Sequence, residues 1–69
     1  MRFAIVARNW ATGEDLGQVA ETATAQDALA ALDRLAAEHP ACVVLTVIAG
    51  GVPVIERDGT RPQDGDRVA

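Results

Sequence analysis

Residues 24–48 read TAQDALAALDRLAAEHPACVVLTVI, a helix signal followed directly by a strand signal. Thr24 is a good N-cap, with Asp27 three residues on as in a capping box. Pro40 disfavours helical geometry at the residue before it and so ends the helix. Residues 41–48 are apolar and β-branched, which favours a central strand. The apolar stripe expected on the helix consists of Ala25, Ala28, Leu29, Leu32, Leu35 and Ala36.

The segments on either side of this stretch complete the fold. Residues 2–9 alternate as a strand, with Phe3, Ile5 and Ala7 on the side that the helix is expected to cover. Residues 11–15 read as a polar turn, and residues 16–22 follow as a second, weaker strand. Gly50-Gly51 is typical of a two-residue hairpin, after which residues 52–57 return as a fourth strand. Pro53 requires an edge, a strand start or a bulge. The sequence therefore predicts an α+β fold in ββαββ order, an antiparallel sheet of two hairpins with one helix on one face.

The chain is short enough to form only one domain. Its 69 residues predict a single domain over residues 1–61 and a flexible C-terminal tail over residues 62–69, which holds only Val68 as a larger apolar group. A chain of this size buries about 60% of its extended surface on folding. Burial against a partner or a second copy would therefore stabilise it.

Composition limits the partners and the compartment. The net charge is −4, and all six cations are scattered arginines. Such a chain has no basic patch for direct nucleic-acid binding, but it is attracted to basic proteins. One cysteine cannot form an internal disulfide, and neither a signal peptide nor a membrane-spanning run is recognisable. The cytoplasm of a bacterial host is the expected location.

Catalytic chemistry is not expected. Serine, lysine and tyrosine are absent, and His39 with Cys42 is the only pairing of a nucleophile with a base. These two residues flank Pro40, and no third group is evident to orient them. Cys42 reads as a small apolar strand residue, and His39 suits the negative end of the helix dipole. We therefore predict a non-enzyme with no metal site and no cofactor.

The third strand indicates a binding surface. Cys42, Val44, Thr46 and Ile48 face one way and Val43, Leu45 and Val47 the other, yet one helix can cover only one side. Trp10 either caps the core at the end of the first strand or stands on the uncovered side, as interface aromatics do. The residues predicted to bind a partner are Arg2, Val6, Arg8, Trp10, Glu14 and Asp15.

The layout over about residues 1–59 resembles that of small type I anti-CRISPR proteins, including type I-F and I-C inhibitors. The matching features are the initial strand Arg2-Phe3-Ala4-Ile5-Val6, the short strand leading into Ala23-Thr24-Ala25-Gln26-Asp27-Ala28, and the glycine hairpin. The resemblance implies a phage-derived protein that binds a type I CRISPR surveillance complex (Cascade) and blocks capture of target DNA. It carries over no individual functional residue.

Two alternatives remain open at this point. HicB-like antitoxins also place a strand pair before a helix similar to Ala25–Leu35, which implies a module that masks a toxin. The second alternative is a structural homodimer domain with no inhibitory role. Neighbouring genes and the mass in solution distinguish these alternatives.

Overall fold

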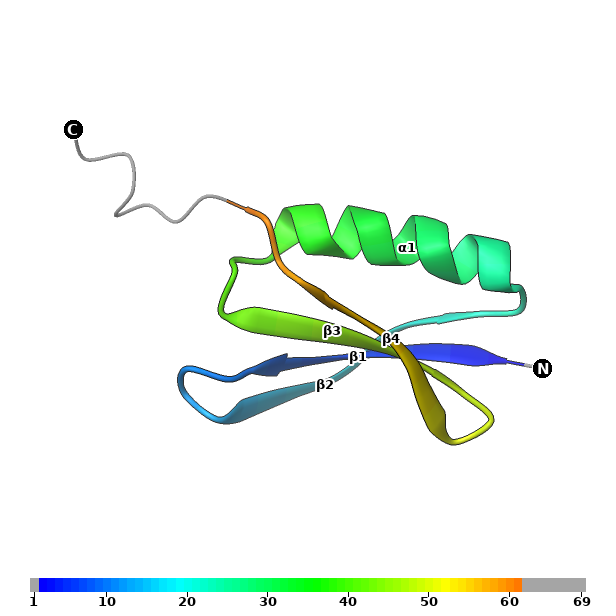
Figure 1. The fold of residues 1–69 in the computed structure, drawn as a ribbon, viewed down its shortest axis with the longest axis horizontal. Coiled ribbons are helices and arrows are strands. Elements are labelled where there is room, and N and C mark those ends of the chain that lie inside the picture. Colours follow the sequence, from blue (N-terminus) through cyan, green and yellow to red (C-terminus); the bar gives the residue numbers. More distant parts are fainter. Residues whose placement is uncertain (1, 62–69) are drawn as a thin grey trace.

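The computed structural model describes residues 2–61, which form a four-stranded antiparallel sheet with one helix against one face (Figure 1). The elements are β1 (Phe3–Asn9), β2 (Glu14–Thr22), α1 (Ala25–Glu38), β3 (Val43–Ala49) and β4 (Val52–Asp58). The strand order is β2-β1-β3-β4. The predicted α+β fold and its ββαββ order are confirmed. Within these residues, no helix has the length and apolar character needed to cross a membrane.

The first hairpin is tighter than the sequence suggested. The Asn9 side chain accepts hydrogen bonds from the backbone N–H groups of Ala11 and Thr12 at 3.0 and 3.1 Å. Gly13 closes the turn by donating to the Asn9 carbonyl at 2.8 Å, with a φ of 79°. Because the turn ends there, Glu14 and Asp15 belong to β2, so their assignment to a polar turn is wrong.

The helix begins and ends at the residues that the sequence indicated. The Thr24 side chain accepts a hydrogen bond from the backbone N–H of Asp27 at 3.1 Å, and His39 is the C-cap immediately before Pro40. The predicted stripe is only partly buried, because Ala25 and Leu29 are exposed while Ala31 is buried. The buried side of α1 consists of Ala28, Ala31, Leu32, Leu35 and Ala36.

The core lies between α1 and one side of the sheet. Every second residue of β1 and β3 points into it, so Ile5, Leu45 and Val47 are almost fully buried against Leu32. Ile5 lies on the side of the first strand that was predicted to face the helix, whereas the sequence left open which side of the third strand the helix covers. Figure 1 shows α1 along this side of the sheet and no described element along the other.

The chain after β4 is tied to the end of the helix. Gly59 is buried, and its N–H donates to the Val43 carbonyl at 2.9 Å. Thr60 donates from its backbone N–H and its hydroxyl to the Ala36 carbonyl, at 2.7 and 3.2 Å. These hydrogen bonds hold residues 59 and 60 against β3 and the C-terminal end of α1. The predicted tail, residues 62–69, lies outside the described residues.

Candidate protein-interaction surface

The uncovered side of the sheet, here called the open face, is built from three cross-strand rows. Directly paired residues point to the same side of a sheet, so the register places their side chains together. In the order β2, β1, β3, β4, the rows are Asp15–Arg8–Val44–Asp58, Gln18–Val6–Thr46–Glu56 and Glu21–Ala4–Ile48–Pro53. The middle of the open face is apolar, and its outer strands carry charge.

The central side chains of the open face are half-buried by one another. Val6, Val44 and Ile48 belong to the two inner strands and have no described element above them. Their counterparts in β3, Val43, Leu45 and Val47, are buried under α1. Among the described residues, the side of β3 that α1 does not cover is that of Val44, Thr46 and Ile48. Cys42 was predicted on the same side, but it precedes β3 and packs against the core.

The carboxylates on the β2 and β4 edges of the open face differ in how closely arginine side chains approach them. On β2, Glu21 lies 3.5 Å from the Arg2 guanidinium, and Asp15 pairs across the strands with Arg8. The Asp15 carboxylate also accepts a hydrogen bond from the Gly17 N–H at 2.8 Å. On β4, neither Glu56 nor Asp58 has a cation within 4 Å among the described residues. Of these four carboxylates, only Glu21 forms an ion pair among the described residues, and the two of β4 also have no arginine directly opposite them in the register.

Trp10 continues the register of β1 beyond its last strand residue. Its backbone N–H donates to the Cys42 carbonyl at 3.0 Å, and its indole N–H donates to the Ala41 carbonyl at 3.3 Å. The side chain is nevertheless 63% exposed. This degree of exposure does not fit a cap over the core. It leaves a large exposed aromatic group next to the end of β1.

The six residues predicted to bind a partner are only partly brought together. Val6, Arg8 and Asp15 lie in adjoining rows of the open face. Arg2 is not in these rows, but its guanidinium forms an ion pair with Glu21, which is. Glu14 instead pairs with Asn9 at the end of the sheet, outside the three rows. The sequence did not indicate Glu56 or Asp58, because their place opposite Thr46 and Val44 depends on the register of β4.

His39 and Cys42, the two remaining reactive side chains, make separate contacts in the described part of the chain. The Nδ1 atom of His39 lies 2.8 Å from the Leu35 carbonyl, where the ring helps to complete the helix terminus. Cys42 is half-buried and packs against the core. Within residues 2–61, no three His, Cys, Asp or Glu side chains gather as metal ligands would.

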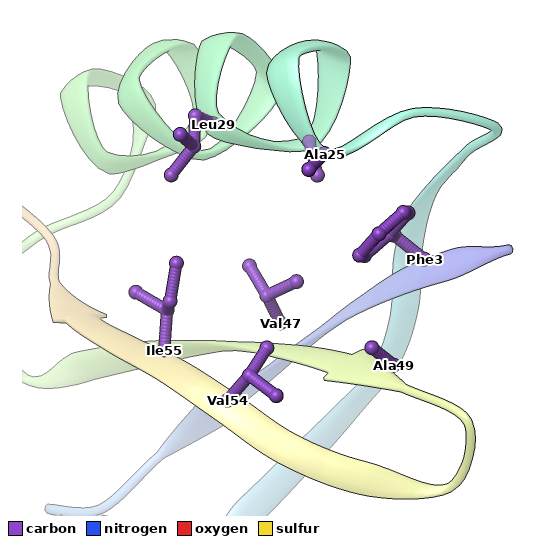
Figure 2. A pocket seen from close by; sticks show the side chains of 8 residues that line it. Phe3, Ala25, Leu29, Val47, Ala49, Val54 and Ile55 are labelled. Carbon is purple, nitrogen blue, oxygen red and sulfur yellow. The ribbon is translucent and has the colours of Figure 1, made fainter. Parts of the chain in front are cut away.

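An apolar groove of about 230 Å³ opens on the helix side, away from the open face. Figure 2 shows the Ala25 and Leu29 side chains directed from α1 towards Phe3 and the β3–β4 hairpin. Val54 contributes to the lining because a register shift between Val47 and Ile48 gives β4 an extra residue there. The sequence missed this groove because it treated Leu29 as core. With no polar group to orient a ligand, the groove selects only for apolar shape.

Comparison of the chain with protein-family models, curated proteins and solved structures found no significant match. The fold and the open face together describe a small α+β domain that presents one uncovered side of a sheet.

Proposed function

We propose that this chain is a non-catalytic binding protein whose partner docks on the open face of the sheet. The observation that carries the proposal is a central strand that is apolar on both sides and covered on one. Val44 and Ile48 are chemically equivalent to the buried Val43 and Val47, yet only half-buried. A strand of this kind is typical of sheets with cover on both sides.

The open face suits a protein partner better than the apolar groove does. It combines apolar side chains, an exposed tryptophan and arginine, and uncompensated carboxylates, whereas the lining of the groove carries no charge that would select a partner. Aromatic and arginine side chains are enriched among the residues that dominate binding energy. Charged groups around them favour one partner over others.

The carboxylates favour a partner with a basic surface. Glu56 and Asp58 would be attracted to lysine or arginine and repelled by nucleic-acid phosphates. A type I CRISPR surveillance complex, the partner implied by the resemblance of the layout, is therefore the first candidate. In this proposal the chain inhibits the complex by occupying a basic groove that would otherwise hold target DNA.

The test is binding to a purified type I surveillance complex by wild type and two variants. Val44→Arg places a long cation in the middle of the open face, and Ala30→Arg makes the same type of change on the exposed side of α1. We expect wild type and Ala30→Arg to bind equally and Val44→Arg to lose binding, with all three folded by circular dichroism. No binding by wild type would exclude this partner, and equal binding by all three would exclude the open face.

A further inference from the structure

We propose that the element docking on the open face is a basic amphipathic helix of the partner protein, with its cations towards the β4 edge. This inference rests on the proposed function and specifies the chemistry of the partner. Its grounds are the width of the apolar strip, its length, and the unequal compensation of the two acidic edges.

The width of the open face matches one helix. The outer strands β2 and β4 are separated by three strand spacings, about 14 Å at roughly 4.8 Å each. A helix with its side chains is about 10–12 Å across. A helix lying over Val6, Val44 and Ile48 would therefore hold its flanking side chains above the carboxylates of the outer strands. α1 already packs on the opposite side in a comparable way.

The length of the strip sets the length of the helix. Val44 and Ile48 are four residues apart in β3, about 14 Å at 3.4 Å per residue. A helix rises about 1.5 Å per residue, so roughly nine residues cover this distance. Two to three helical turns with apolar residues on one side would fill the strip.

The charges orient this helix. On β2, Glu21 forms an ion pair with Arg2, and Asp15 lies directly opposite Arg8 in the register without an ion pair within 4 Å. The neighbouring cation of β4, Arg57, is directed to the other side of the sheet, where it forms an ion pair with Asp33 of α1. Glu56 and Asp58 therefore remain available, so lysine or arginine on the docking helix should line up along β4.

A second copy of this chain fits the open face less well. The face holds four carboxylates, Asp15, Glu21, Glu56 and Asp58, and two arginines, Arg2 and Arg8, so its net charge is 2 − 4 = −2. Two such faces in contact would bring together a net charge of −4. The edges of the sheet are also poor sites for self-pairing, since register shifts interrupt both outer strands and Pro53 lies in β4.

The experiment is a titration of the full chain with a synthetic 14-residue helical peptide, followed by the methyl NMR signals. The peptide has leucines along one face and lysines along one flank of that face, and the control peptide has glutamate at every lysine. We expect the basic peptide to shift the methyl signals of Val6, Val44 and Ile48 and to leave those of Leu32 and Leu35 unchanged. The acidic peptide should bind far more weakly.

Glu56→Lys and Glu38→Lys make the same change in charge, one on the β4 edge and one on the exposed side of α1. We expect Glu56→Lys to weaken binding of the basic peptide up to about fivefold, the upper end of the range of an exposed charge pair. Glu38→Lys should have no effect.

Three results would overturn this inference. They are equal binding of the two peptides, shifts centred on Leu29 and Val54 in the apolar groove, or no binding at all. Methyl shifts of the open face that depend on protein concentration alone would show that a second copy covers it. If Val44→Arg abolishes binding to the natural partner while the basic peptide fails to bind, only the helix inference fails. If partner binding does not depend on Val44, the proposed function fails.

Discussion

Gly59 is the position where one added carbon should do the most damage. A Cβ at this residue would lie 2.2 Å from the carbonyl oxygens of both His39 and Pro40. These are backbone atoms, so no side-chain rotation can relieve the clash. The Gly59→Ala variant must therefore move the end of β4 away from the segment that follows α1.

The cost of this movement can be estimated from what it disrupts. Overpacking in a close-packed site costs about 1–3 kcal/mol. Moving Gly59 also weakens its 2.9 Å hydrogen bond to the Val43 carbonyl and the adjoining bonds from Thr60 to the Ala36 carbonyl, each worth about 1 kcal/mol. We expect a loss of about 3 kcal/mol in the free energy of unfolding. In a domain of this size, that lowers Tm by roughly 12–24 °C.

Thermal and urea unfolding followed by circular dichroism measures the effect. Gly13→Asn is the matched control, because Gly13 has a positive φ of 79° and nothing within 4 Å of an added Cβ. Asparagine tolerates that conformation, so the control should lose less than about 1 kcal/mol. A loss below about 1 kcal/mol for Gly59→Ala would contradict the close approach of Gly59 to residues 39–40.

Further variants test three separate parts of the structure. Trp10→Ala should lower stability by no more than about 1 kcal/mol, the worth of its indole hydrogen bond, yet weaken partner binding by about 2 kcal/mol or more; unfolding of this variant would instead place Trp10 in the core. Ala25→Leu should fill part of the apolar groove and raise stability by about 1 kcal/mol in urea unfolding, whereas Ala30→Leu on the exposed side of α1 should not. Truncation after Arg61 should leave Tm nearly unchanged. Thr60→Ala should lower Tm by several degrees, because the variant loses the hydrogen bond from the Thr60 hydroxyl to the helix terminus. A large decrease in Tm on truncation would show that residues 62–69 pack on the domain.

The local signals in the sequence were sufficient for most of the fold. Thr24 and Pro40 mark the two ends of the helix through contacts within a few residues. The alternation of Phe3, Ile5 and Ala7 identified the side of the sheet that α1 covers. Such features depend on neighbouring residues, so a single sequence contains them. Non-local contacts were missed. Thr60 completes a helix terminus 24 residues earlier in the chain, and no periodicity indicates that pairing.

The candidate surface was predicted in its centre and missed at one edge. Val6 and Arg8 follow from strand alternation alone, whereas Glu56 and Asp58 join the open face only through the register of β4 on β3. That register includes a shift at Val47/Ile48, and it places Val54 in the groove. The extra residue of a β-bulge cannot be recognised in the sequence of one strand, because a bulge is a property of the pairing of two strands.

Site-specific photo-crosslinking in the natural host tests the central claim most directly, without assuming the identity of the partner. A photoreactive residue replaces Gln18, which is exposed in the middle row of the open face, or Ala30, which is exposed on α1. We predict one dominant crosslinked protein from position 18 that is absent from position 30 and is lost when Val44→Arg is added. A partner captured equally from both positions, or only from position 30, would contradict the assignment of the open face as the binding surface.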